Sequence, residues 1–299
     1  MLARRAHNRG KAVGLKPTST HAQSSVFSLS AASQQRRTTM TQQTPDAKCN
    51  SQGAAKSVFI TGASSGLGRQ MAIEFSRRGY RLALTARRLD LLQALQAELA
   101  ASGGGPVFVA ALDVTDEVAV AQVFAQARAQ LGSLDIVVAN AGVGHHGIIG
   151  KLAFDRVRDT INTNVIGFMA TVDAAMHHFK EQGHGHLVGI SSVAAFRGMP
   201  AGGVYGASKA AVTTYLESLR AETHSSPIVV TTLSPGFIDT PLNRGAKSRP
   251  FVIGVERGGK LLVDLIERQV ESATVPRWPW SVVARVMAVL PTSLIAKMR

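Results

Sequence analysis

A tyrosine and a lysine stand four residues apart in Tyr205-Gly-Ala-Ser-Lys209, early in a stretch whose composition predicts a helix. Side chains at this spacing leave the same face of a helix, one turn apart. A free phenol has a pKa near 10, and a fixed positive charge beside it favours the phenolate and lowers that value. The pair therefore predicts proton exchange with an oxygen substituent near neutral pH. In isolation, the same spacing more often marks two solvated side chains.

A glycine-rich turn near the start of the apolar part of the chain is a candidate phosphate site. Thr61-Gly-Ala-Ser-Ser-Gly-Leu-Gly68 lies between a predicted strand at 57–61 and a predicted helix at 69–78. Glycines allow a tight turn and close backbone approach, and helix N–H groups bind pyrophosphate. The G-x-x-x-G-x-G spacing departs from the common G-x-G-x-x-G, and such a turn can be purely structural. The candidate cofactor-binding residues here are Gly62, Ser64, Ser65, Gly66, Leu67 and Gly68.

The end of the second predicted strand indicates which dinucleotide would bind. In NAD-binding folds an acidic residue about 20 positions after the glycines accepts the ribose 2′-hydroxyl. Here the sequence is Thr85-Ala-Arg-Arg88, with two guanidinium groups and no carboxylate. Arginine binds a 2′-phosphate through charge-assisted hydrogen bonds, whereas an acid would repel it. We therefore expect NADP(H) in preference to NAD(H), with Arg87 as the first candidate and Arg88 or Arg69 as helpers.

Two later strands end in small or polar residues. Asp113-Val114 closes the third predicted strand, where a carboxylate could meet the adenine amine. Asn140-Ala141-Gly142 closes the fourth, where small side chains let a cofactor lie against the backbone. Ligands of open α/β sheets bind at the carboxyl ends of the strands. Asp113, Val114, Asn140, Ala141 and Gly142 are therefore added to the cofactor-binding candidates.

The elements that would position these residues alternate between short apolar runs and longer helical stretches. This alternation predicts an α/β fold: a single Rossmann-type, doubly wound parallel sheet with helices on both faces. No internal repeat or second core is visible, so one catalytic domain over 55–275 accounts for the chain after its first segment. The expected strands are 57–61, 81–85, 107–112, 134–139, 187–190 and 228–233, and the expected helices are 69–78, 89–100, 115–131, 154–158, 164–180, the Tyr205 helix to about 222, and 254–270.

Residues 1–54 have a different composition from the rest. They are rich in Ser, Thr, Gln and Ala, and before Asp46 they carry seven basic residues and no acidic one. This predicts a disordered basic arm or a targeting segment. A mitochondrial or other organelle transit peptide, a solvated tail, and an upstream extension with Met40 as the true start remain alternatives. We expect a cytoplasmic protein, or an organellar one if the arm is a transit peptide.

Charge and cysteine content limit the other classes of function. The seven basic residues of the arm make up half of the net charge of +14, and no basic stripe interleaved with aromatic residues predicts a nucleic-acid partner. With Cys49 as the only cysteine, disulfides and thiolate metal sites have no support. We expect no metal, including at His184-Gly-His186, because no acidic residue or cysteine lies near it at the spacing of metal ligands. His145-His146 is interpreted as part of a solvated loop, although it could line a substrate mouth.

Residues 276–299 form a separate apolar and basic segment that predicts a C-terminal helix. The run after Trp278-Pro-Trp280 is interrupted by Arg285 and ends at Pro291, so it is too short to cross a bilayer. A helix with tryptophan anchors and basic residues could lie on a membrane surface. Packing against its own domain or a partner subunit is the favoured interpretation, and peripheral membrane contact is the alternative.

Together these motifs resemble the short-chain dehydrogenase/reductase family. The likeness runs over about residues 56 to 240 in family order, and the set is specific. It consists of Thr61-Gly-x-x-x-Gly-x-Gly68, Asp113-Val114, Asn140-Ala-Gly142, Asn164, Ser192 at 13 residues before the tyrosine, Tyr205-x-x-x-Lys209 and Pro235-Gly236.

The resemblance implies roles for these residues. Tyr205 would be the general acid or base, and Lys209 would lower its pKa and hold the nicotinamide ribose. Ser192 would orient the substrate oxygen, with Ser191 as a competitor, and Asn164 would fix a water of a proton relay. The backbone at Pro235 and Gly236 would lie along the nicotinamide, with Thr240 nearby. The residues expected to border the substrate pocket are Phe196, Arg197, Met199, Phe237 and Leu242.

The sequence therefore predicts an NADP-dependent oxidoreductase that exchanges a hydride between nicotinamide C4 and a small-molecule carbonyl or secondary alcohol. A homodimer or homotetramer is what the resemblance implies. The alternative is a cofactor-binding sensor or scaffold on the same fold without turnover, because fold alone does not determine function.

Overall fold

A seven-stranded parallel sheet forms the centre of the computed structural model, which describes residues 55–245 and 248–298. The predicted arm at 1–54 lies outside the described residues. The strand order is β3-β2-β1-β4-β5-β6-β7, so the order reverses between β1 and β4. That reversal is the topological switch point at which open α/β sheets bind ligands. The strands are β1 Ser57–Thr61, β2 Arg81–Ala86, β3 Val107–Ala111, β4 Ile136–Ala139, β5 Gly185–Ile190, β6 Ile228–Pro235 and β7 Ser272–Val275.

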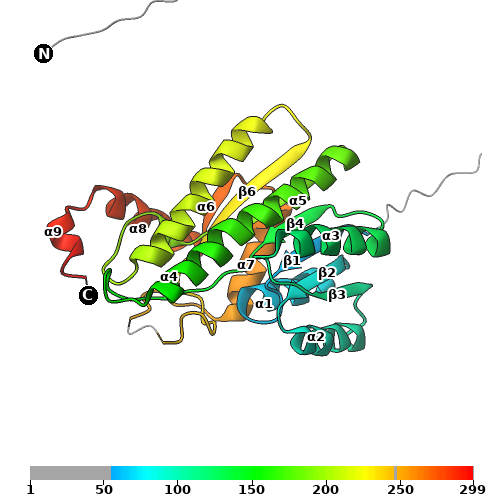
Figure 1. Ribbon diagram of the computed structural model, residues 1–299, viewed down its shortest axis with the longest axis horizontal. Coiled ribbons are helices and arrows are strands. Elements are labelled where there is room, and N and C mark those ends of the chain that lie inside the picture. Colours follow the sequence, from blue (N-terminus) through cyan, green and yellow to red (C-terminus); the bar gives the residue numbers. More distant parts are fainter. Residues whose placement is uncertain (1–54, 246–247, 299) are drawn as a thin grey trace, which may run out of the picture. The chain divides into compact units, whose positions relative to one another are not determined.

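Helices cover both faces of this sheet (Figure 1), as the alternating pattern predicts. Side chains of β1 show how the two cores arise: Val58 and Ile60 enter one cluster while Phe59 enters the other, because successive strand residues point to opposite faces. The first cluster is closed by α1, α2 and α7, and the second by α3, α5 and α6. The main helices are α1 Gly66–Arg77, α2 Leu89–Ala101, α3 Glu117–Leu131, α4 Phe154–Ile161, α5 Gly167–Gln182, α6 Gly203–Glu222 and α7 Val255–Glu267.

Two features of the sheet and its helices differ from the prediction. The seventh strand, β7, was not expected, because its residues were assigned to no predicted strand or helix. It pairs with β6 over Thr232–Pro235 at the edge of the sheet. The second difference is a π-helical turn at Asn162–Ile166, which joins α4 to α5 and carries Asn164. Turns of this kind are frequent at functional sites.

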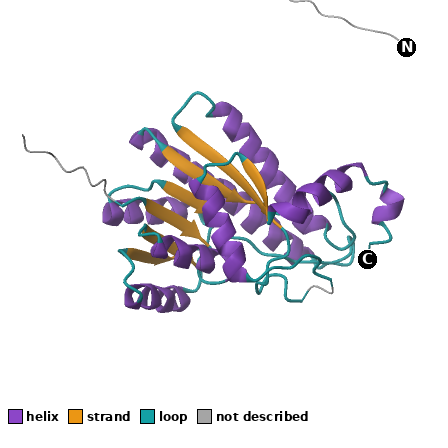
Figure 2. Cartoon of the chain, turned by 180° about the vertical axis from the view of Figure 1, so that it is seen from behind, coloured by secondary structure: helices purple, strands orange, loops and turns teal. Residues whose placement is uncertain are grey.

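The C-terminal segment is two short helices rather than the single helix predicted for 276–299. They are α8 Arg277–Val289, which is interrupted by non-helical geometry at Trp278, and α9 Thr292–Ile295. Pro291 separates them, because proline cannot continue a helix without loss of a hydrogen bond. Figure 2 shows both helices beyond the end of the sheet. Among the helices that the structure describes, none has the length and apolarity to span a membrane.

Candidate active site

Tyr205 and Lys209 occupy the first two turns of α6, at the carboxyl edge of the sheet. The Lys209 Nζ atom lies 6.0 Å from the centre of the Tyr205 ring. Lys209 is 5% exposed, and its ammonium donates a hydrogen bond to the Ile190 carbonyl oxygen at the end of β5, at 2.9 Å. The predicted proximity of the phenol and the ammonium is therefore present.

The electrostatics of the pair differ from the prediction that Lys209 lowers the tyrosine pKa. Removal from water raises the pKa of Tyr205, while a hydrogen bond with Ser192 acts in the opposite direction. Burial also lowers the pKa of Lys209 to about 8. Both shifts have the same cause, because desolvation disfavours the charged form of either group. The geometry brings the pair together, and burial is the largest cause of both pKa shifts.

This desolvation predicts a pH dependence of stability. In the unfolded chain Lys209 keeps its proton to about its ordinary pKa of 10.5, whereas the folded chain releases it near 8. Between these values the unfolded state binds more protons, so the free energy of unfolding rises with pH. Relative to Lys209→Met, we expect the wild type to gain stability between pH 8 and 10, with each unit of pKa difference corresponding to about 1.4 kcal/mol.

Denaturant titrations of both proteins across this pH range measure the effect. The raised pKa of Tyr205 acts in the opposite sense only above pH 10, outside the window. A stability difference that does not change with pH would contradict the assignment of a desolvated ammonium to Lys209.

The two adjacent serines at the end of β5 have different environments. The Ser191 hydroxyl donates to the Lys209 carbonyl at 3.0 Å and bonds the Thr213 hydroxyl at 2.8 Å, so it fastens β5 to α6. The Ser192 hydroxyl accepts from the Ala194 N–H at 3.1 Å, and the Ser192 side chain lowers the pKa of Tyr205. The geometry therefore favours Ser192 over Ser191 as the partner of Tyr205.

Asn164 joins the loop after β4 to α6. Its Oδ1 accepts from the Val143 N–H at 2.8 Å, and its Nδ2 donates to the Val143 carbonyl at 2.9 Å and to the Ser208 hydroxyl at 3.0 Å. The residue is 1% exposed. These contacts give the side chain a positioning role that the sequence did not predict. It holds the loop that begins with Gly142 beside the helix that carries Tyr205.

The glycine turn between β1 and α1, which we call the cradle, has a tight backbone that requires glycine at several positions. Gly62 and Gly66 have φ values of +69° and +57°, which favour glycine. A methyl group on Gly68 would collide with the Gly62 carbonyl oxygen and lie 2.6 Å from the Asn140 Nδ2 atom. The α1 helix starts at Gly66, so its first N–H groups face the turn. The remaining candidates of the turn, Ser64, Ser65 and Leu67, lie in the same segment.

Residues from other strand ends meet this turn. Asn140 donates through Nδ2 to the Thr61 carbonyl at 2.9 Å, and the N–H groups of Asn140 and Ala141 donate to the Thr61 hydroxyl at 3.0 and 3.1 Å. Asn140 therefore fastens β4 to the turn. A methyl group on Gly66 would lie 3.5 Å from the Thr240 Cβ atom, so Thr240 also borders the turn.

The other strand-end candidates also lie along this edge. The Gly142 Cα–H bond points toward Asn164 and Lys209, since an added Cβ would lie 3.1 Å from Oδ1 and 3.5 Å from Nζ. Asp113 accepts from the Thr115 N–H and hydroxyl at 3.0 and 2.8 Å, which shapes the turn after β3. Val114 is buried. Pro235 ends β6, and the Gly236 N–H donates to Val275 of β7 at 2.9 Å.

The arginines proposed for the 2′-phosphate have different surroundings. The Nη2 atom of Arg88, rather than of Arg87, donates to the hydroxyls of Ser64 and Ser65 at 3.1 and 2.9 Å. Arg69 forms an ion pair with Glu98. Arg87 is exposed and makes no hydrogen bond within the part of the chain that the structure describes. The guanidinium at the phosphate turn is therefore that of Arg88.

The histidine pair lies in the loop after β4, with His145 half-buried and His146 exposed. His145 Nε2 lies 2.7 Å from the Asp159 carboxylate of α4. The ring of His146 lies 5.5 Å from the ring of Tyr205, and partial desolvation and the charge of His145 lower its pKa. Sequence reasoning missed this contact. The signal was its position, because His146 follows Asn140-Ala-Gly142 at a strand end that faces the ligand edge.

An aromatic cluster joins the C-terminal segment to the end of β6. The Trp280 ring lies 6.0 Å from Phe237 and 5.8 Å from Phe251. The Trp280 indole Nε1 lies against Gly236, because a Cβ added to Gly236 would collide with it. This Nε1 has no hydrogen-bond partner among the described residues. Arg197 donates to the Leu290 carbonyl at 3.1 Å. Thus α8 packs on its own domain, next to two predicted pocket residues.

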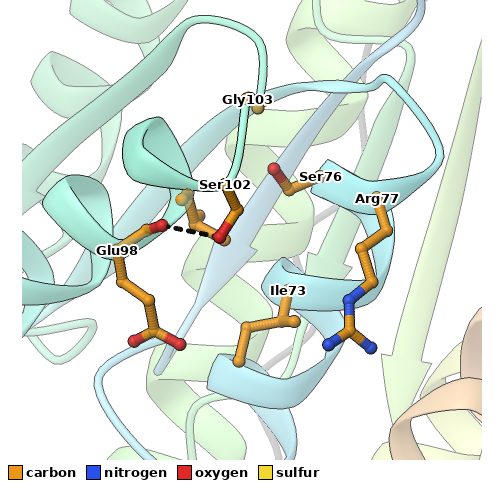
Figure 3. A pocket seen from close by; sticks show the side chains of 8 residues that line it. Ile73, Ser76, Arg77, Glu98, Ser102 and Gly103 are labelled. Carbon is orange, nitrogen blue, oxygen red and sulfur yellow. Dashed lines mark hydrogen bonds between the residues drawn. The ribbon is translucent and has the colours of Figure 1, made fainter.

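Two cavities lie outside this constellation. One of 260 Å³ is lined by Arg197, Gly198, Thr292 and Ile295, under α9. The other, of 150 Å³, lies between the last turns of α1 and α2 and is lined by Arg77 and Glu98 among others (Figure 3). That cavity is at the amino edge of the sheet, far from Tyr205. No cluster of metal-ligating side chains occurs in residues 55–245 or 248–298.

Comparison with known proteins gives a consistent result. Residues 56–250 match the family model described as short chain dehydrogenase. An uncharacterized oxidoreductase of Mycobacterium tuberculosis is 42% identical over 239 residues, covering 79% of this chain and 94% of that protein. An uncharacterized oxidoreductase of Myxococcus xanthus is 40% identical over 240 residues, covering 80% and 94%. Mouse dehydrogenase/reductase SDR family member 7B is 35% identical over 192 residues, covering 63% and 59%.

Solved structures have the same fold. An alcohol dehydrogenase from Thermococcus sibiricus, in complex with 5-hydroxy-NADP, superposes with a TM-score of 0.67 at 28% identity, covering 74% of this chain and 96% of that one. A protein from Burkholderia phymatum in complex with NAD superposes with a TM-score of 0.71 at 23% identity, covering 82% and 95%, and shows the fold alone.

Proposed function

Since the chain belongs to the short-chain dehydrogenase/reductase family of NAD(P)-dependent oxidoreductases, we propose that it transfers a hydride between NADP(H) and a carbonyl or secondary alcohol, with Tyr205 as general acid and base. The observation that carries the proposal is the position of Tyr205. The Ser192 side chain lowers the pKa of this phenol. The Lys209 Nζ atom lies 6.0 Å from the centre of the Tyr205 ring, at the carboxyl edge of the sheet.

The residues present fit a dinucleotide. A Cβ on Gly68 would fill the cradle, and a Cβ on Gly142 would crowd Lys209. The pyrophosphate would be held by the glycine turn, through Gly62, Ser64, Ser65, Gly66, Leu67 and Gly68. The adenine would lie against Asp113 and Val114, and the middle of the cofactor against Asn140, Ala141 and Gly142. The nicotinamide would lie against Pro235, Gly236 and Thr240. The bound cofactor supplies the hydride at its C4 atom.

Side chains of this protein would transfer the proton to and from the substrate oxygen. The Ser192 hydroxyl donates to the substrate oxygen and orients it. Tyr205 gives its phenolic proton to that oxygen during reduction and takes it back during oxidation. Lys209 supplies positive charge near the phenolate that forms, and Asn164 holds the loop and α6 in register. The arrangement needs no metal.

An assay of NADPH oxidation against a panel of carbonyl compounds tests this proposal. Reduction of at least one carbonyl, with loss of NADPH absorbance proportional to enzyme, is the expected result. The alternative function, a cofactor-binding sensor or scaffold, predicts NADPH binding by calorimetry with no turnover on any member of the panel.

Cofactor preference provides a separate prediction. The exposed guanidiniums of Arg87 and Arg88 can bind a 2′-phosphate, and Arg88 is already directed toward Ser64 and Ser65. Removing a hydrogen bond to a charged group costs about 1.5–3 kcal/mol. We expect Arg88→Ala to weaken NADPH binding about tenfold or more and to leave NADH binding nearly unchanged, with Arg87→Ala showing a smaller change in the same direction.

Calorimetric titration of each variant with NADPH and NADH measures these effects. Arg128→Ala is the matched control, because Arg128 is an exposed arginine that pairs with Glu181 on α5, away from the turn. Equal losses for the two cofactors would remove Arg88 from the 2′-phosphate site.

The remaining parts of the proposal concern assembly and location. We infer a homodimer or homotetramer, which light scattering on the purified protein tests. The substrate is a small molecule, and no nucleic-acid partner is proposed. Residues 55–275 form the catalytic domain of this proposal and 276–299 an accessory segment. The cytoplasm is the proposed location, and a mitochondrial one would follow if the arm directs import.

A further inference from the structure

Exposed apolar side chains are concentrated in three segments that neighbour the candidate active site. Fifteen large apolar side chains of the described residues are exposed, and twelve of them lie in 148–154, 242–252 and 278–298. Only Leu91, Val118 and Ile166 lie elsewhere. We refer to the exposed apolar side chains of these three segments as the apolar rim. A concentrated patch of this kind marks an interaction site, unlike single exposed residues.

Contacts place all three segments close to the reacting groups. A methyl group on Gly203, two residues before Tyr205, would lie 3.0 Å from the Ile149 Cδ1 atom. One on Gly144, in the loop that Asn164 fixes, would lie 3.1 Å from the Leu242 Cδ1 atom. The third segment reaches the second through the rings of Phe251 and Trp280. The apolar rim therefore lies beside the start of α6, which carries Tyr205, and beside the loop after β4.

The α8 helix supplies an ordered part of this rim. Val282, Val286 and Val289 follow one another at spacings of four and three, so they share one helix face. They are 42%, 48% and 81% exposed, and Trp278 just before them is 74% exposed. The opposite face of the helix is occupied, since Trp280 is buried against Phe237 and Gly236. The helix thus has one face packed on its domain and one apolar face in solvent.

The positive charge of the C-terminal segment indicates which kind of surface the apolar rim contacts. Arg277, Arg285 and Lys297 are exposed, and no acidic residue follows Glu271 in the sequence. An apolar helix face with a tryptophan anchor and basic neighbours fits the interface of an anionic lipid bilayer. A second copy of the chain fits less well. In a two-fold contact the same patch meets itself, so the exposed basic residues Arg277, Arg285 and Lys297 of both copies would share one interface with no acidic residue of this segment to pair with them.

We propose that the apolar rim rests on an anionic lipid surface and opens the active site toward it. A substrate taken up through such an entrance is a carbonyl or alcohol with a long apolar part, dissolved in the lipid. The choice of substrate rests on the proposed oxidoreductase function, whereas the docking itself does not.

Cosedimentation of the full chain with vesicles tests the docking. The vesicles contain equal parts of phosphatidylcholine and phosphatidylglycerol, with pure phosphatidylcholine as the reference. We expect binding to the anionic vesicles and about a tenfold loss of bound protein when Trp278→Ser and Val289→Ser are combined, since burial of apolar area drives such binding. Arg277→Gln with Arg285→Gln should weaken binding to anionic vesicles and leave the weak binding to neutral ones unchanged.

The matched control combines Leu91→Ser and Val118→Ser, two exposed apolar residues outside the rim. The basic stretch before residue 55 is present in every variant, so differences between variants report on the rim alone. Equal losses in the rim and control variants, or no vesicle binding by the intact chain, would overturn the proposal. So would a dimer in solution that dissociates on the rim substitutions, which would make a second copy the occupant.

The same samples separate this proposal from the proposed function. Docking is scored by sedimentation without substrate, and turnover is scored with long-chain and short-chain ketones in the presence of vesicles. Vesicle binding without turnover on any ketone would refute the oxidoreductase function and leave the docking intact. Turnover that is faster on short-chain than on long-chain ketones would refute the lipid-dissolved substrate.

Discussion

Tyr205→Phe is expected to lower kcat by a factor of about 10²–10⁴, the usual contribution of a positioned general acid or base. The substitution removes only the phenolic hydroxyl, whose pKa Ser192 lowers. The ring contact with His146 and the position of α6 are kept. Cofactor affinity should therefore change little, because the glycine turn is untouched.

Steady-state kinetics on a carbonyl that the wild type reduces, together with NADPH titration, measures this result. Tyr215→Phe is the matched control, because Tyr215 lies on the same helix and packs edge-to-face on Phe168 instead of near the reacting groups. Unchanged kcat in Tyr205→Phe would refute the role of the phenol, and an equal loss in both variants would indicate damage to α6.

The second large effect is expected for Gly68→Ala. The added methyl group would collide with the Gly62 carbonyl oxygen and with Asn140 Nδ2. Both belong to the cradle, and the first is backbone that cannot rotate away. Overpacking costs about 1–3 kcal/mol, and for a chain of this size each kcal/mol lowers Tm by roughly 2–4 °C. Displacement of the turn should also weaken NADPH binding tenfold or more, which corresponds to about 1.4 kcal/mol.

Thermal unfolding and NADPH titration check both parts of this prediction. Gly254→Ala is the matched control, since a methyl group there meets no atom within 4 Å and its φ of −64° suits alanine. A Gly68→Ala protein with wild-type Tm and wild-type NADPH affinity would show that the turn is not a tight cradle.

Motifs that depend on local spacing were predictable from the sequence. Tyr205 and Lys209 lie on one helix face because α-helical geometry fixes residues four apart. The parallel sheet followed from alternating apolar runs and amphipathic stretches, and the family match over residues 56–250 confirms the family. The glycine turn was recognisable because few other residues adopt the positive φ found at Gly62 and Gly66.

Features that depend on packing between distant segments were not predictable. The side chain of Arg88 reaches Ser64 and Ser65 across more than 20 positions, and adjacent arginines give no pattern that distinguishes it from Arg87. The contact of His146 with Tyr205 spans the β4–α4 loop and α6. The expected lowering of the Tyr205 pKa was wrong for the same reason, because burial in the folded chain sets its direction.

The C-terminal segment illustrates a further limit. Its apolar and basic composition predicted a helix and left packing and membrane contact as alternatives. The structure shows that packing and exposure occur on opposite faces, with Trp280 buried and Trp278 exposed. The sequence alone does not show which of two tryptophans two positions apart is buried and which is exposed. The break in helical geometry at Trp278 separates their environments.

The central claim is hydride transfer at the carboxyl edge of the sheet, and isotope transfer tests it most directly. NADPH deuterated at one or the other C4 position is incubated with the enzyme and a panel of ketones. The deuterium content of the product alcohols is then measured by mass spectrometry. The account predicts deuterium on the carbinol carbon from one of the two labelled cofactors and not from the other. A protein that binds both labelled cofactors yet delivers deuterium to no ketone would contradict it and support the sensor or scaffold alternative.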